Sequence, residues 1–349
     1  MSHRIKTGIR TLFCLALLCV LLKEPRLAAQ GLQSGVQLCL STVLPALFPF
    51  FVLCGLLPTL SCRRGPLRGT ARLWGLQDSD AVVTIFLSWI GGYAVCARLV
   101  GQRFREGGLS SHDAALTLML GCCSGPGFVV GSVGGLLLGN PRLGILLYVL
   151  QIAANLLSAA VCLPLLPKQT ARQNGNAWVP AKEKRLPQAI GDAVESSLQV
   201  CGCVLFFRIV STVLLPYLPA YPLVGACLSA LLEISAGCAD FASLGGKMAL
   251  YGCCLCLSTL GFSVWAQLSL LLQGAVELRL LVLQRLVHLL LFTALTRLLT
   301  PLLPGITTVY STLSQRVIPM HRLPLDAAVL VFFFVGAVLY KVQQNFYNK

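Results

Sequence analysis

Apolar segments separated by short polar ones run along nearly the whole chain. Most approach the roughly 20 residues that a helix needs to cross a bilayer. The pattern therefore predicts an all-α polytopic membrane protein with about eight transmembrane helices and two re-entrant hairpins. The apolar segments fall at residues 9–22, 36–60, 81–97, 113–138, 143–166, 189–216, 222–239, 248–272, 280–300 and 325–340.

A pattern rich in glycine and cysteine occurs twice, each time inside an apolar segment. The first copy, Gly121–Phe128, interrupts segment 113–138. The second copy, Gly252–Cys254 with Ser258–Ser263, interrupts segment 248–272. Two half-copies with broken helices are how many secondary transporters build a solute site near the middle of the bilayer. Glycine in membrane helices also serves close packing, and that alternative stays open.

These segments divide the chain into two repeats within one membrane domain, 1–349. The first repeat is expected at 36–166 and the second at 189–300. A polar, basic, proline-flanked linker at 167–188 joins them on the cytoplasmic side, and a further transmembrane helix is expected at 325–340.

The composition agrees with a membrane protein. The chain is 56% hydrophobic and only 11% charged, whereas soluble domains are near one quarter charged. The net charge of +15 does not indicate nucleic-acid binding, because no soluble module carries a basic patch interleaved with aromatics.

The basic residues set the predicted topology. If 81–97 and 222–239 enter the bilayer and return, and the N-terminus lies inside, most of the 27 Lys and Arg residues fall in cytoplasmic loops, including 98–112 and 273–285. This is the bias expected of cytoplasmic loops. Both termini are then cytoplasmic, and the two halves are inverted relative to each other.

Glu233 is the strongest single candidate for function, because a carboxylate within an apolar segment is costly and defaults to a functional role. A paired structural residue or one near the interface is the alternative. Arg98 and Arg208 are candidate contacts for an anionic solute, and Arg208 could instead pair with Glu233. His288 is expected to be a packed or interfacial residue.

Enzyme and metal chemistry find little support in the sequence. Ser124-Gly125 with His288 would be a serine–histidine pair without positional support, and no nucleotide-binding loop or metal-binding helix occurs. The 16 cysteines lie almost entirely in apolar segments, where they behave as small hydrophobes. We expect no enzyme activity, no metal and no cofactor. A coupling ion, H⁺ or Na⁺, and oligomerisation are left open.

Several motifs, in the same order along nearly the whole chain, resemble the sporulation integral membrane protein family of spore-forming Firmicutes (YlbJ-like). The resemblance rests on 43–51, 91–98, 107–110, 124–126, 232–237 and 261–267. This family belongs to the Gate, or nucleoside-recognition, group, which is similar to concentrative nucleoside transporters. The chain departs from the family pattern at Ala94, Cys96, Cys122 and Trp265.

The resemblance implies an inverted-repeat transporter in the outer forespore membrane that moves dipicolinic acid into the developing spore. A nucleoside-type permease and a non-transporting scaffold for spore envelope assembly are the alternatives. The expected partners are a small-molecule substrate and the lipid bilayer. The implied substrate-binding positions are Gly92, Tyr93, Ser124, Gly125, Pro126, Glu233, Ser235, Gly261, Phe262, Ser263 and Gln267.

Overall fold

The computed structural model describes residues 3–56, 67–167, 185–217 and 221–302. These residues form helices joined by short connections and contain no strand, which confirms the all-helical prediction. The predicted C-terminal helix at 325–340 and most of the predicted linker at 167–188 lie outside the described residues.

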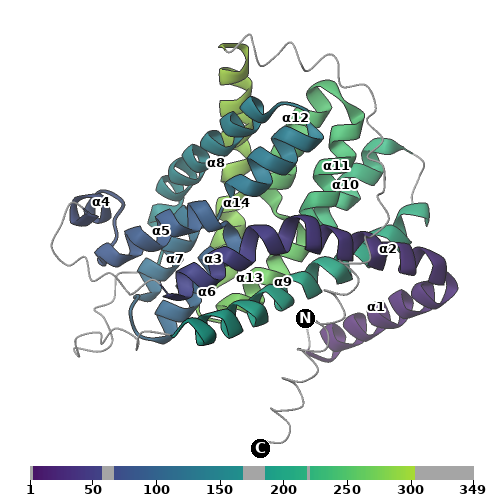
Figure 1. Cartoon of the computed structure of the whole chain (residues 1–349), viewed down its shortest axis with the longest axis horizontal. Coiled ribbons are helices and arrows are strands. Elements are labelled where there is room, and N and C mark those ends of the chain that lie inside the picture. The colour runs from purple at the N-terminus through teal and green to yellow at the C-terminus, as the bar shows by residue number, and fades with distance from the viewer. Residues whose placement is uncertain (1–2, 57–66, 168–184, 218–220, 303–349) are drawn as a thin grey trace, which may run out of the picture. The chain divides into compact units, whose positions relative to one another are not determined.

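The chain begins with four helical elements that lead into the first half. They are α1 (His3–Lys23), α2 (Pro25–Leu38), the π-helical turn η1 (Cys39–Val43) and α3 (Leu44–Leu56). Both α2 and α3 pack along α9 (Leu186–Leu214), and Figure 1 shows α2 and α3 following one another across the helical unit.

Residues 23–35 lie between the predicted apolar segments 9–22 and 36–60, but they are not a loop, because α2 occupies most of them. Two glycines explain the helix. A Cβ on Gly31 would lie 2.8 Å from the Cα of Ile209, and one on Gly35 would lie 3.0 Å from the Leu205 side chain. Small residues four apart let two helix backbones approach closely, so α2 is held by its contact with α9.

Residues 79–105 form an antiparallel hairpin, which we call the first hairpin. It consists of α5 (Ser79–Gly91) and α6 (Tyr93–Arg105), joined at Gly92. At its open end, Arg103 contacts Asp80 at 3.0 Å, and this buried pair closes the hairpin. The structure agrees with the prediction that 81–97 turns back, but α6 extends to Arg105, so Arg98 and Arg103 lie on a helix and not in a loop. The short helix α4 (Leu67–Leu73) precedes the hairpin.

A broken helix follows the first hairpin. Its first part is α7 (Ser111–Gly121), and its second part is the π-helix η2 (Gly127–Leu137). The intervening residues 122–126 form what we call the first break. After it, α8 (Pro141–Cys162) packs against η2, where a Cβ on Gly134 would lie 2.4 Å from the Cα of Gly144.

The second half repeats this order of elements after α9. The second hairpin consists of α10 (Pro222–Leu232) and α11 (Ile234–Leu244), joined at Glu233. The second broken helix consists of α12 (Gly246–Thr259) and α13 (Gly261–Leu272), and we call Leu260–Gly261 the second break. Helix α14 (Leu278–Leu299) packs along α8. Short 3₁₀ turns are η3 (Leu163–Leu165), η4 (Leu215–Tyr217) and η5 (Thr300–Leu302).

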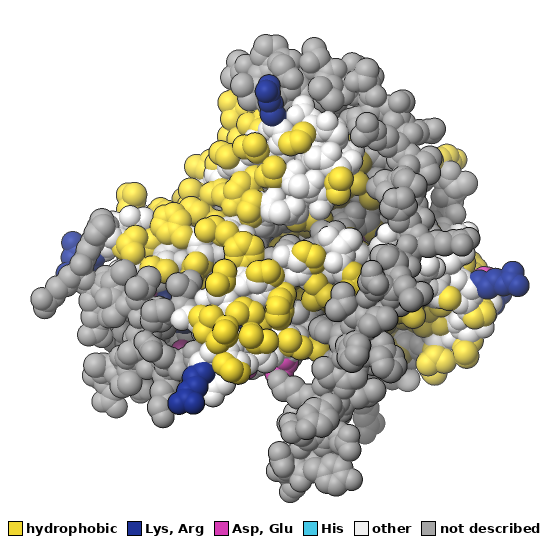
Figure 2. Space-filling model, viewed as in Figure 1, with side chains coloured by type: hydrophobic (Ala, Val, Ile, Leu, Met, Phe, Trp, Pro, Cys, Tyr) yellow, Lys and Arg dark blue, Asp and Glu magenta, His cyan; other side chains and the backbone are white. Residues whose placement is uncertain are grey.

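The described helices are suited to a bilayer. Four helical stretches are long and apolar enough to span one: Pro141–Leu165, Leu186–Tyr217, Gly246–Leu272 and Leu278–Leu299. Figure 2 shows apolar side chains spread over much of the described surface, with Lys and Arg side chains near its edges. A large continuous apolar surface marks a membrane or protein contact, so these residues belong to a helical membrane protein.

Candidate functional site

The tip of the first hairpin packs directly on the first break. Gly92 has a φ of +83°, and a Cβ there would lie 3.1 Å from the backbone nitrogen of Gly125. A Cβ on Gly125 would in turn lie 3.2 Å from the carbonyl oxygen of Ile90. A Cβ would be crowded on either side, and the contact is made by backbone.

The second hairpin meets the second break in the same way. Gly261 has a φ of +68°, and its Cβ position lies 3.0 Å from the carbonyl oxygen of Ala230 and 3.4 Å from the backbone nitrogen of Glu233. Leu260 also has a positive φ, +69°, which is rare for a branched side chain. Each hairpin tip thus sits on the break of its own half.

A cavity of about 90 Å³ lies where the two halves meet. The first hairpin tip and the first break form part of its wall, and Ser235 from the second hairpin forms another part. We call it the central cavity. Its lining residues are Val43, Leu47, Phe50, Ile90, Gly91, Gly92, Tyr93, Gly125, Gly127, Phe128 and Ser235.

Three helices begin at this cavity. Tyr93 opens α6, Gly127 opens η2, and Ser235 is the second residue of α11. The first N–H groups of a helix lack partners within it, and the N-terminus carries a partial positive charge. No side chain caps the start of α6 or η2. The cavity therefore has a wall suited to negatively charged groups.

Glu233 caps the N-terminus of α11, whereas α6 and η2 have no side-chain cap. Its carboxylate accepts a hydrogen bond from the backbone N–H of Ala236 at 2.7 Å, and the residue is 1% exposed. A negative group at a helix N-terminus stabilises that helix. Glu233 is thus buried at the tip of the second hairpin, although it is not part of the cavity lining.

Some of the remaining predicted site residues lie next to the central cavity, and others do not. Ser124 is buried beside the cavity-lining Gly125, and Pro126 directly precedes η2. Ser263 accepts a hydrogen bond from Gln267 at 3.1 Å, and both are buried away from the cavity lining. Phe262 is 54% exposed, so its ring does not face the central cavity.

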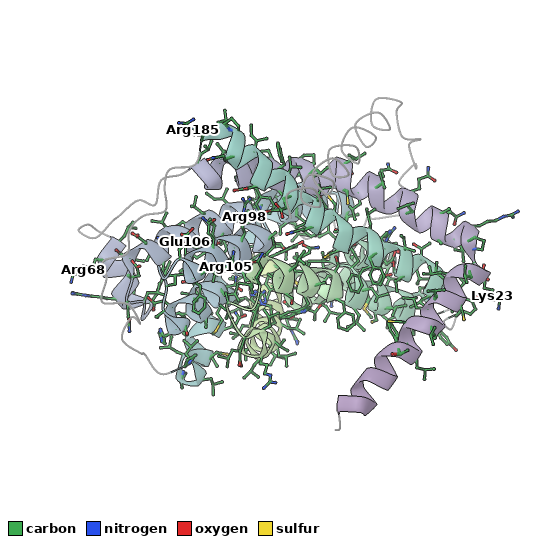
Figure 3. All side chains as sticks on the ribbon, turned by 90° about the horizontal axis from the view of Figure 1, so that it is seen from below. Lys23, Arg68, Arg98, Arg105, Glu106 and Arg185 are labelled. Atoms are coloured by element: carbon green, nitrogen blue, oxygen red, sulfur yellow. The ribbon has the colours of Figure 1, made fainter. Side chains whose placement is uncertain are left out.

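The two arginines proposed as anion contacts lie elsewhere. Arg208 donates to Ser34 on α2 at 3.1 Å. Arg98 lies over the ring of Phe51 and lines a separate polar cavity of about 350 Å³ that also holds Glu106, Asp192 and Glu195. Figure 3 shows Arg98, Arg105 and Glu106 in one region of α6 and its end.

The two tryptophans beside the breaks serve the backbone. Trp89 donates to the carbonyl oxygen of Leu120 at 2.9 Å, and Trp265 donates to that of Thr259 at 2.9 Å. The last carbonyls of a helix need partners outside it. Each indole therefore stabilises the end of a helix just before its break.

The sequence analysis missed a buried polar cluster between α8 and α14. Arg285, which was assigned to the loop 273–285, lies in the second turn of α14 and is 3% exposed. It donates to the carbonyl oxygen of Cys122 at 2.8 Å, to the side chain of Asn155 and to that of Gln284. Asn155 donates to the same Cys122 oxygen at 3.1 Å.

The cluster continues along both helices and reaches the second break. Gln151 on α8 donates to the carbonyl oxygen of Ser124 at 2.7 Å. The Nε2 atom of His288 lies 3.2 Å from the carbonyl oxygen of Gln151, and its Nδ1 atom lies 2.9 Å from the hydroxyl of Ser258. Since a carbonyl only accepts, Nε2 carries a proton. This agrees with the expectation of a packed histidine.

A sequence signal for this cluster does exist. Gln284, Arg285 and His288 interrupt a leucine-rich stretch at adjacent and i, i+3 positions, which brings them together on a helix. Counting Arg285 among loop charges concealed that signal.

Comparison with known proteins adds no further support. No protein-family model matches the chain, and neither a curated protein nor a solved structure is significantly similar.

Proposed function

We propose that the chain is a secondary transporter of a small planar, anionic metabolite, with dipicolinic acid moved into the forespore as the favoured substrate and direction. The observation that carries this proposal is the central cavity, where two uncapped helix N-termini and a third helix start surround one space. Broken helices that point their N-termini at an anionic group are a recurring design in secondary transporters. The substrate and the forespore membrane come from the family resemblance.

The proposal includes two inverted repeats. The order of helix, hairpin, broken helix and long helix occurs twice, opened by α2 and α3 in the first half and by α9 in the second. The packing between halves is also reciprocal, since α6 of the first hairpin contacts α13 of the second broken helix, and α11 of the second hairpin contacts η2 of the first. Inverted repeats supply alternating access when the two halves exchange conformations.

The cavity must widen to hold its solute. Ligand pockets usually have roughly 300–1,000 Å³, whereas the central cavity has about 90 Å³. Because the tips of both hairpins form its wall, their separation from α3 and from each other would enlarge it. The described conformation then corresponds to a closed state of the cycle.

A nucleoside-type permease is the second candidate, and it needs Glu233 to bind a sugar hydroxyl. The carboxylate already binds Ala236 and lies outside the cavity lining. The geometry therefore supports an anion better than a nucleoside.

The test is uptake by the purified chain reconstituted into vesicles. Labelled dipicolinate and a labelled nucleoside are offered separately, with empty vesicles as the control. We expect saturable dipicolinate uptake above the control. Nucleoside uptake alone would favour the permease, and uptake of neither by folded protein would favour the scaffold.

A further inference from the structure

Arg285 is a buried cation, and none of its described partners is a carboxylate. Its three hydrogen-bond acceptors are the oxygens of Cys122, Asn155 and Gln284, all neutral. Its Nη1 atom is buried and has no hydrogen-bond partner among the described residues. A buried charge normally needs an opposite charge or a metal nearby, and an intramembrane ion is by default functional.

The other titratable groups around the guanidinium do not supply that charge. Cys96, Cys122 and Cys123 interact with it electrostatically, but a thiol is neutral in its ordinary form. His288, one turn away on α14, is the remaining titratable neighbour and is itself neutral or cationic. The positive charge is therefore uncompensated within the described residues.

The position of this charge relates it to the central cavity. The guanidinium binds the carbonyl oxygen of Cys122, and Gly125, three residues further along, lines the cavity. Three residues span at most about 11 Å. At that range the field of a charge in a protein interior is substantial, and the bonds to Asn155 and Gln284 fix the guanidinium in place.

We propose that Arg285 is the residue that makes the solute site selective for anions. It provides the net positive charge behind the first break, while the N-termini of α6 and η2 add their partial positive charge at the cavity wall. This inference rests on the proposed transport function and adds the residue that sets the charge of the substrate. Arg98 and Arg208 do not have this role, because carboxylates share the cavity of Arg98, and Arg208 interacts electrostatically with the carboxylate of Glu233.

The test compares charge variants in vesicles by the preference for dipicolinate over its neutral diamide, measured as a competition ratio. Arg285→Gln removes the charge. Asn155→Asp keeps the arginine and places a carboxylate against it, which neutralises the site. It also removes the N–H that bonds the Cys122 oxygen, so the melting temperature of this variant without ligand is measured to show that it folds. Arg297→Gln is the control, since it removes an exposed arginine from the same helix as Arg285.

We expect Arg285→Gln and Asn155→Asp each to lower the competition ratio at least tenfold, and Arg297→Gln to leave it within twofold of the natural chain. A second readout is the rise in melting temperature that dipicolinate gives the detergent-solubilised protein, which both site variants should lose. An unchanged ratio in Asn155→Asp, with the natural chain active, would overturn the role of Arg285 alone. Absence of uptake and of stabilisation in the natural chain would overturn the transport proposal itself.

Discussion

Single glycines decide whether the hairpin tips can reach the breaks. Gly92 and Gly261 combine a positive φ with a backbone neighbour near enough to crowd a Cβ. The sequence showed glycines at these places and linked them to a site. It could not show which glycine touches which backbone, because such contacts join segments about 30 residues apart.

Replacing Gly92 by alanine should impair transport. The backbone at Gly92, with φ +83° and ψ −178°, lies in a region that almost only glycine adopts, and it costs a residue with a Cβ about 1–3 kcal/mol. The new methyl group would also press on the nitrogen of Gly125. Gly107→Ala is the control, since Gly107 has a φ of +72° with open space around its Cβ position. Both variants should melt earlier, but only Gly92→Ala should lose dipicolinate uptake in vesicles. Equal uptake by the two variants would contradict the contact.

The roles of charge and cap at Glu233 can be separated by two substitutions. Glutamine keeps an oxygen that can accept from the Ala236 N–H, whereas alanine removes it. Loss of a helix cap costs about 0.5–2 kcal/mol. We expect Glu233→Ala to lower the melting temperature and Glu233→Gln to lower it less.

If Glu233 also carries a proton or meets the solute, Glu233→Gln should abolish uptake while protein abundance stays unchanged. Full uptake by Glu233→Gln would restrict the residue to capping α11.

The hairpins are the elements that sequence reasoning located best. Short length, internal glycine and the distribution of basic residues all indicated that 81–97 and 222–239 turn back, and the turns lie at Gly92 and Glu233. Helix α2 was missed because its polar residues resemble a loop. The pair Gly31 and Gly35, spaced by four, was the available signal of a packed helix.

The buried pair of Asp80 and Arg103 should hold the first hairpin closed. Arg103 also donates to the Asp80 carbonyl and to Thr84, so several hydrogen bonds tie its guanidinium to α5. Removing one partner leaves a buried charge alone, which costs about 3–5 kcal/mol. We expect Arg103→Met to lower the melting temperature of the detergent-solubilised protein sharply.

Gln102→Ala is the comparison for that variant, because it breaks only the exposed bond to Glu106 and should change stability by about 0.5 kcal/mol or less. Similar melting of the two variants would show that the pair does not hold the hairpin.

At the scale of the molecule, the all-helical fold and its membrane character followed from hydrophobicity alone. The count of eight spans stays a prediction, since 325–340 lies outside the described residues. The prediction that Arg285 lies in a cytoplasmic loop was also wrong. The topology prediction counted every arginine near the end of a span as a loop charge.

The inverted arrangement predicts that the open ends of the two hairpins face opposite sides of the membrane. Glu106 ends the first hairpin and Ser243 lies near the end of the second, and both are exposed. In intact cells, an impermeant maleimide should label Ser243→Cys but not Glu106→Cys, and permeabilised cells should allow labelling of both. The unsubstituted chain gives the background. Labelling of both from outside would exclude the arrangement.

The side chains shared by α8 and α14 have a mechanical consequence. Arg285 and Gln151 donate hydrogen bonds to the carbonyl oxygens of Cys122 and Ser124, in the first break. His288 contacts the hydroxyl of Ser258, just before the second break. The first and second breaks are thereby held by the same pair of helices, α8 and α14, which limits their movement relative to each other. The moving parts of any transport cycle are then the two hairpins, whose tips at Gly92 and Glu233 meet the breaks at Gly125 and Gly261 through backbone atoms.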